Sequence, residues 1–334
     1  SANKMKVGFI YIGPPGDHGW TYAHDQGRLM LEEQLGDQVE TTFVEGVPEG
    51  PDAERTIAKL AETGHKLIFT TSFGYMEPTL KAAKRFPDVK FEHATGYQQA
   101  DNVATYSARF YEGRYVQGQI AAKMSKSGVI GYIASFPIPE VVRGINAFML
   151  GAQSVNPDMK VKVVWVYTWF DPPKEADAAK VLMDQGADMI TQHTDSTAAI
   201  QAAADRGVLA FGQASDMIHF APDTQLTANM NTWGPYYVAR TQAVLDGTWT
   251  SGDTWHGMGD GMVVMAPFTN MPDSVRQMAT ETTAALTSGK LHAFTGPIHN
   301  QAGELVVPAG ETADDGMLAG MNFYVKGVDD KLPE

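Results

Sequence analysis

The residue types best suited to binding chemistry gather at residues 13–20, in the order Gly-Pro-Pro-Gly-Asp-His-Gly-Trp. This segment follows an apolar run, residues 6–12, that is typical of a buried strand. In open α/β sheets, ligands bind beyond the carboxyl ends of the strands. Asp17 could accept hydrogen bonds from ligand N–H groups, Trp20 could stack on a flat ring, and His18 lies between them. The turn is therefore predicted to bind a flat ligand that carries N–H donors.

The same turn is unsuited to phosphate. Its three glycines follow a G-x-x-G-x-x-G pattern, which differs from the dinucleotide-binding and P-loop motifs. Pro14 and Pro15 remove two backbone N–H donors that a phosphate cradle would use. The negative charge of Asp17 would also repel a phosphate. We therefore do not expect a nucleotide phosphate at this turn.

Aromatic residues follow four of the predicted strands. Each one, taken alone, is explained by packing in the core, but the repetition at four strand ends favours an aromatic-walled cleft. Stacking of a base on such a ring contributes about 1–3 kcal/mol. The aromatic candidates are Trp20, Phe73, Tyr75, Phe136, Trp169 and Phe170.

Carboxylates occupy similar places, and each one could accept a charge-assisted hydrogen bond from a ligand N–H. The alternative for each is a helix cap or a solvated turn. For Asp195 we favour a helix cap or a solvated turn, whereas for Asp171, which precedes two prolines, ligand binding and this structural alternative both stay open. The carboxylate candidates for ligand binding are Asp17, Asp171, Asp216 and Asp260.

Composition restricts the class of protein. The net charge of −14 and the pI of about 5.0 argue against nucleic acid and anionic membranes, because both need a positive field. The absence of cysteine excludes thiolate metal sites, disulfides and a thiol nucleophile. The 9 histidines show no metal-ligand spacing, and neither G-x-S-x-G nor H-E-x-x-H occurs. We therefore expect no metal, no cofactor and no enzymatic activity.

Short apolar runs alternate with helical patterns along the chain, which predicts βαβ units and parallel sheets. They form two series, residues 6–108 and 129–230, each long enough for a sheet of its own. Two such lobes would place a ligand between their strand ends. The predicted strands are 6–12, 39–45, 67–71, 90–95, 103–108, 129–134, 161–168, 189–193, 208–213 and 226–230, with a return strand in 257–267 and a helix over 274–288.

Several motifs, in order along most of the chain, carry a resemblance to a known family. Residues 17–21 read Asp-His-Gly-Trp-Thr, where the family has a turn of the form Asp-x-x-Phe-Asn. The other motifs are 82–91 (AAKRFPDVKF), 111–124 (YEGRYVQGQIAAKM), 144–161 (GINAFMLGAQSVNPDMKV), 185–190 (QGADMI) and 212–216. In these motifs the chain resembles the basic membrane protein family of periplasmic substrate-binding proteins, which includes purine-nucleoside receptors of ABC importers.

The resemblance implies an α/β type I binding fold, with two Rossmann-like lobes joined by a three-crossover hinge. We expect residues 1–108 plus about 233–256 in the N-terminal lobe. Residues 109–232 plus about 257–334 would form the C-terminal lobe, with the assignment of 257–334 left open. By position, Asp17 and Trp20 would bind and stack the base. Phe73, Trp169 and Asp216 would line the cleft.

The resemblance also implies a receptor that delivers its ligand to ABC permease subunits. We expect a monomer in the periplasm, its signal peptide removed ahead of Ser1. Two departures bear on the ligand. The nucleoside receptors carry an Asp after the strand motif 90–95, where this chain has His93-Ala94-Thr95-Gly96, and a Lys near the strand 226–230, where it has Asn231 and Trp233. Loss of this charged pair and the gain of Trp233, which is a further candidate for ligand binding, favour a purine base such as adenine. The alternative is a purine nucleoside receptor, or the ligand-sensing domain of a signalling receptor.

Overall fold

The computed structural model describes residues 3–334 and contains two compact units. Unit 1 comprises the chain up to Ala108 together with Thr232–His256, and unit 2 comprises Arg109–Asn231 together with Gly257–Glu334. The chain therefore crosses between the units after Ala108, after Asn231 and after His256. Ser1 and Ala2, on which the predicted removal of a signal peptide depends, lie outside the described residues.

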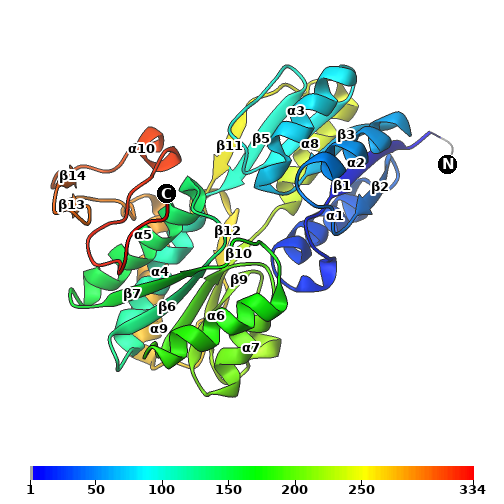
Figure 1. Ribbon diagram of the computed structural model, residues 1–334. Helices are drawn as coiled ribbons and strands as arrows, with labels where there is room; N and C mark the ends of the chain where they lie inside the picture. The colour runs from blue at the N-terminus through cyan, green and yellow to red at the C-terminus, as the bar shows by residue number, and fades with distance from the viewer. Residues whose placement is uncertain (1–2) are drawn as a thin grey trace. The chain divides into compact units, whose positions relative to one another are not determined.

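Unit 1 is a parallel sheet with helices on both faces (Figure 1). The strand order is β11-β5-β4-β3-β1-β2, and every neighbouring pair is parallel. Helices α2 and α3 pack together on one face, and α1 and α8 pack together on the other. The elements are β1 Met5–Ile10, α1 Trp20–Leu35, β2 Val39–Val44, α2 Pro51–Glu62, β3 His65–Thr70, α3 Met76–Arg85, β4 Lys90–Ala94, β5 Val103–Ala108, α8 Gly234–Asp246 and β11 Asp253–His256, with 3-10 helices η1 Pro15–Asp17 and η2 Phe73–Tyr75.

Unit 2 repeats this architecture with the strand order β12-β10-β9-β8-β6-β7, in which only β12 runs antiparallel. Helices α6 and α7 cover one face, and α4, α5 and α9 lie on the other (Figure 1). The elements are α4 Phe110–Met124, β6 Val129–Ala134, α5 Pro139–Val155, β7 Lys160–Trp165, α6 Pro172–Asp184, β8 Met189–His193, α7 Ala198–Asp205, β9 Leu209–Ala214, β10 Gln225–Asn231, β12 Val263–Met265 and α9 Asp273–Ser288, with 3-10 helices η3 Ile218–Phe220 and η4 Met258–Asp260.

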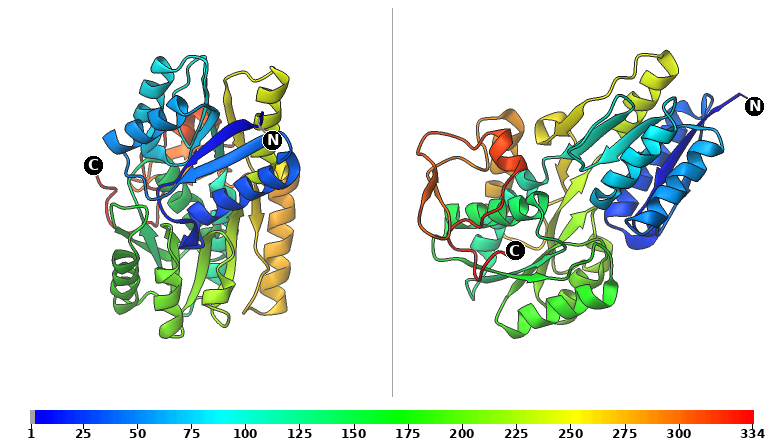
Figure 2. Two further views of the ribbon diagram at one scale, coloured as in Figure 1. Left: turned by 90° about the vertical axis from the view of Figure 1, so that its right-hand side faces the viewer. Right: turned by 45° about the horizontal axis from the view of Figure 1, so that its top comes forward.

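The C-terminal segment after α9 lies along α5 (Figure 2). It contains a short hairpin, β13 Ile298–His299 with β14 Leu305–Val307, and helix α10 Asp315–Ala319. Asn146 on α5 holds the segment at both amide atoms, because its Nδ2 donates to the Phe323 carbonyl at 2.7 Å and its Oδ1 accepts from Val325 N at 3.0 Å. Backbone hydrogen bonds continue this attachment, since Asp329 N donates to the Val161 carbonyl.

The predicted strands are confirmed to within three residues at either end, and the predicted helix over 274–288 is confirmed as α9. Strand β7 ends at Trp165, before the predicted residue 168, because Tyr167 adopts a left-handed backbone with φ of 53°. The predicted return strand is shorter than 257–267, because a 3-10 turn and the left-handed Gly261 precede Val263. Strand β11 was missed, since two of its four residues are exposed, two are half-buried, and they form no hydrophobic run.

Candidate functional site

Asp17 stabilises the start of helix α1. Its carboxylate is 4% exposed and accepts three backbone hydrogen bonds, from Gly19 at 2.8 Å and from Thr21 and Tyr22 at 3.0 Å each. A carboxylate at a helix N-terminus also interacts favourably with the helix dipole. Asp17 therefore fixes the turn from which Trp20 extends. The backbone of His18 adopts a left-handed conformation, and its side chain is exposed, with the ring centroid 5.4 Å from that of Tyr22.

Trp20 and Trp233 lie together in unit 1. The Trp20 indole is 7% exposed, and its Nε1 donates to the Thr71 carbonyl at 2.7 Å. Its ring meets Trp233 edge-on at 5.7 Å. Trp233 is 1% exposed and stacks on the buried His24 at 4.6 Å with an interplanar angle of 11°. The two indoles therefore share one packed aromatic cluster, which couples Trp20 to the core of the unit.

Phe73 lies in η2, after strand β3, and is half-buried beside the exposed Tyr97 at 6.3 Å. His93, in the segment 93–96 where the nucleoside receptors differ, is 1% exposed and its Nε2 lies 2.7 Å from the Ser72 carbonyl. Burial lowers the pKa of His93 to about 4. A side chain at Gly96 would collide with the His93 ring, so a glycine is required there. His93 therefore holds the loop that carries Phe73.

In unit 2, Phe136 and Trp169 come together beyond the carboxyl ends of β6 and β7. Their ring centroids are 5.1 Å apart, and both side chains are half-buried. Tyr167, which is 55% exposed, extends the cluster to 6.4 Å from Phe136. Two of the aromatic residues predicted to line the site therefore form one wall of rings on this unit.

A histidine and a glutamate lie behind this wall. His193 ends strand β8, with its ring 5.9 Å from Trp169 and 6.4 Å from Phe110. Its Nε2 lies 3.2 Å from Oε2 of Glu140, in the first turn of α5. Burial keeps the pKa of His193 below its ordinary value, although the hydrogen bond to Glu140 opposes this shift. His193 is therefore a buried neutral imidazole at neutral pH.

Of the two carboxylates considered as helix caps, Asp171 caps a helix and Asp195 does not. Asp171 is the N-cap of α6, where its Oδ1 accepts from Lys174 N at 3.1 Å. Asp195 is not the cap of α7, because that position is taken by Thr197. The Asp195 side chain is 3% exposed, and its backbone N donates to the Trp169 carbonyl at 2.8 Å. The prediction of a cap or a solvated turn at Asp195 was therefore wrong, because the side chain is buried and the backbone of this residue is hydrogen-bonded to that of Trp169 in the aromatic wall.

The remaining two carboxylates form hydrogen bonds close to them in the chain. Asp216 is exposed after β9, where its Oδ1 accepts from Gln225 Nε2 at 2.7 Å and from Ile218 N at 3.1 Å. Asp260 is exposed in η4, and its Oδ2 accepts from Gly257 N at 3.1 Å. Both side chains thus have local structural roles within unit 2.

Sequence reasoning missed His193, Glu140 and Tyr167. His193 could have been found, because it stands at the carboxyl end of a predicted strand like the residues that were chosen. Glu140 and Tyr167 carried no comparable signal, since one contributes through a tertiary contact and the other through an exposed loop conformation. Within residues 3–334, the structure contains no group of three or more His, Asp or Glu side chains arranged to hold a metal ion.

Residues 4–290 match the family model of the PnrA-like ABC transporter substrate-binding proteins, named Bmp. The chain belongs to this family. It is 71% identical to a purine-binding protein of Brucella abortus over 99% of this chain and 95% of that one. The predicted family is therefore confirmed, and it is a family of solute-binding receptors.

Two further comparisons bear on ligand and fold. A Haloferax volcanii protein, provisionally named an ABC transporter glucose-binding protein, is 37% identical over 98% of this chain and 81% of its own. The solved structure of an ABC transporter solute-binding protein from Aeropyrum pernix has a TM-score of 0.74 at 19% identity, covering 94% of this chain and 95% of that chain. The type I α/β binding fold is thereby confirmed. No helix within residues 3–334 has both the length and the apolarity that crossing a bilayer requires.

Proposed function

We propose that this receptor binds a purine base, adenine or a close analogue, and supplies it to an ABC importer. The observation that carries the proposal is the arrangement of Phe136, Trp169, His193 and Asp195 at one sheet edge of unit 2. Flat rings offer stacking surfaces to a base, and the polar side chains beside them match its N–H groups and ring nitrogens. The name of the Brucella abortus relative supports the same class of ligand.

In unit 1, we propose that Trp20 stacks on the base and that Phe73 adds a second apolar contact. Asp17 contributes by fixing the position of Trp20, because its carboxylate already accepts three backbone hydrogen bonds. Trp233 supports Trp20 from behind, since only 1% of its surface is exposed. His18, Asp171, Asp216 and Asp260 stay predictions as direct contacts, as does capture of the ligand between two lobes.

A base is favoured over a nucleoside by the two positions where this chain departs from the nucleoside receptors. Neither His93 nor Trp233 offers a charge to a ribose, and both are almost completely buried. Asn231, also buried, supplies an amide in place of an ammonium group. A glucose-like ligand would need a dense set of hydroxyl-binding groups, whereas the wall at Phe136 and Trp169 favours a flat ring.

As a substrate-binding protein of this family, the chain is proposed to work outside the cytoplasm, in the periplasm, as a monomer that docks on permease subunits. No catalytic step is proposed. The test is mass spectrometry of small molecules that co-purify with the protein, followed by a thermal-shift screen of purine bases, nucleosides and glucose. A bound ligand raises stability by mass action, so a purine base is expected to give the largest shift. A larger shift with glucose, or none with any purine, would overturn the proposal.

A further inference from the structure

Buried polar atoms without hydrogen-bond partners gather at the carboxyl ends of three strands of unit 2. Among the described residues, Oγ of Ser135, Nδ1 of His193 and both amide atoms of Asn231 have none. Ser135 directly follows β6, while His193 and Asn231 are the last residues of β8 and β10. Because buried polar groups in native proteins are nearly always paired, this edge is suited to a polar ligand.

We propose that His193 determines the specificity of the receptor, because its Nδ1 accepts a hydrogen bond from an N–H group of the bound purine. This inference rests on the proposed function and names a residue for it that sequence reasoning did not select. Glu140 is the positioning residue for His193, since it holds the opposite nitrogen of the imidazole at 3.2 Å.

The tautomer follows from the two nitrogens of the ring. A carboxylate accepts hydrogen bonds, so Nε2 of the neutral imidazole carries the proton and donates it to Glu140. Nδ1 then carries a lone pair and acts only as an acceptor. A ligand N–H can donate a hydrogen bond to Nδ1. A ligand carbonyl oxygen or unprotonated ring nitrogen cannot, because its lone pair would repel the lone pair of Nδ1. The dyad therefore selects for an N–H at one position of the purine.

The surroundings of His193 keep it in this form. The charged groups that face it are Glu140 and Arg143 on α5 and Arg114 on α4; the two cations oppose its protonation. The rings of Phe110 and Trp169 contact it without adding a titratable group. We expect affinity for adenine to be constant from about pH 8 to about pH 6.5. On further acidification it should fall, because protonation converts Nδ1 into a donor.

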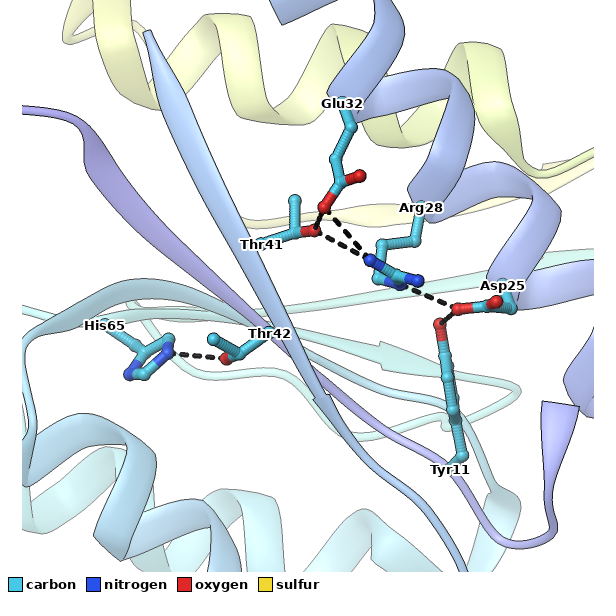
Figure 3. Close-up of polar contacts among 7 residues, drawn as sticks. All are labelled: Tyr11, Asp25, Arg28, Glu32, Thr41, Thr42 and His65. Carbon is cyan, nitrogen blue, oxygen red and sulfur yellow. Dashed lines mark hydrogen bonds and ion pairs between the residues drawn. The ribbon is translucent and has the colours of Figure 1, made fainter. Parts of the chain in front are cut away.

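Two substitutions separate recognition from packing. His193→Asn keeps a polar atom near the place of Nδ1, while His193→Gln keeps one near Nε2 and so retains the contact with Glu140. Calorimetric titration with adenine should show about a tenfold loss of affinity for His193→Gln and a smaller loss for His193→Asn. The control is His65→Gln in unit 1, since His65 is buried and both of its ring nitrogens have partners. Its Nε2 lies 2.7 Å from Thr42 Oγ1 (Figure 3), and its Nδ1 lies 2.8 Å from the Leu60 carbonyl. This control variant should leave affinity unchanged.

Methylated adenines identify the N–H that is recognised. Either 9-methyladenine or N6,N6-dimethyladenine should bind the wild type about tenfold more weakly than adenine, because it lacks the recognised N–H. In His193→Gln, that methylated base and adenine should bind with the same affinity. Equal losses for both His193 variants, or a methylation penalty that persists in His193→Gln, would overturn the role of Nδ1. Unchanged affinity in both variants would mean that Nδ1 binds only water. If the wild type binds neither adenine nor hypoxanthine, the proposed function itself fails.

Discussion

Each unit buries an arginine on a helix that packs against its sheet, but the two arginines have different partners. In unit 1, Arg28 Nε donates to Asp25 at 2.7 Å, and its Nη1 donates to Thr41 and Glu32 (Figure 3). In unit 2, Arg114 donates only to neutral oxygens; Nη2 reaches Gln213 Oε1 at 2.6 Å and the Gln192 carbonyl at 2.7 Å. The first arginine is neutralised locally and the second is not.

The difference appears in the two pKa values. Burial is the largest single influence on Arg28 and opposes its charge, but the hydrogen bond and the charge of Asp25, together with Tyr11 and Glu32, outweigh burial, so the pKa of Arg28 is raised. Burial lowers the pKa of Arg114, which has no carboxylate to offset it. Such a buried cation creates a positive potential around the strand ends of unit 2, where it opposes protonation of His193. A buried charge paired with an opposite charge, like Arg28, is typical of a structural region. A buried charge without such a partner, like Arg114, indicates a binding region.

The largest expected effect separates the two arginines directly. Arg28→Met leaves Asp25 buried without its cation and should lower the free energy of unfolding by about 3–5 kcal/mol. Arg114→Met removes hydrogen bonds but leaves no charge unpaired, so a loss of about 1–3 kcal/mol is expected. Urea denaturation of the two variants measures both values. Equal losses would contradict the claim that the two sites are electrostatically different.

A second comparison concerns the two stacking candidates. Trp20→Ala should destabilise the fold by about 3 kcal/mol as well as weaken ligand binding, because Trp20 is packed against His24 and Trp233. Trp169→Ala, in the half-buried wall of unit 2, should mainly weaken purine binding, by about 1–3 kcal/mol. Thermal unfolding and calorimetry on each variant distinguish these outcomes. A Trp20→Ala protein with wild-type stability would show that the cluster is not structural.

The third test uses acid. The pKa of His93 is lowered from 6.5 to about 4 by burial, so its contribution to stability is complete above about pH 6.5. It is lost as the pH falls toward about 4, because the unfolded chain takes up the proton first. Unfolding free energy should drop on the order of 2 kcal/mol by about pH 5. In His93→Gln, the free energy of unfolding should depend less on pH in this range. If the variant loses as much stability between about pH 6.5 and about pH 5 as the wild type, other groups cause the loss.

The smallest effect contrasts two carboxylates. Asp17→Ala removes three backbone hydrogen bonds at the start of α1 and should cost about 1–2 kcal/mol of stability. Asp216→Ala, at an exposed turn, should cost less than about 1 kcal/mol. Chemical denaturation reports both. If Asp216 proved the more important for stability, its assignment to a local turn would be wrong.

The strands were predictable because parallel sheets covered on both faces produce continuous apolar runs, such as the run over β1. The position of Trp20 after that strand was predictable for the same reason. The burial of Trp20 was not predictable, because its contact with Trp233, like that between His24 and Trp233, joins residues more than 200 positions apart. Likewise, no local pattern distinguishes Asp171, which caps a helix, from Asp195, which does not.

The pair formed by His193 and Glu140 also depends on a tertiary contact that the sequence does not reveal. A strand-end histidine was visible in the sequence, but its tautomer depends on a glutamate at the start of a different helix. Whether a polar residue is satisfied is a property of tertiary contacts, and this property separates the network around Arg28 from the edge at His193.

The central claim is that the chain is a receptor for a purine base. Calorimetric titration of the ligand-free protein with adenine and adenosine under one set of conditions tests it most directly. We predict saturable one-to-one binding of adenine, about micromolar or tighter, corresponding to about −8 kcal/mol. Tenfold tighter binding of adenosine would show that the receptor takes nucleosides, and the absence of binding by adenine and every other purine base would contradict the account.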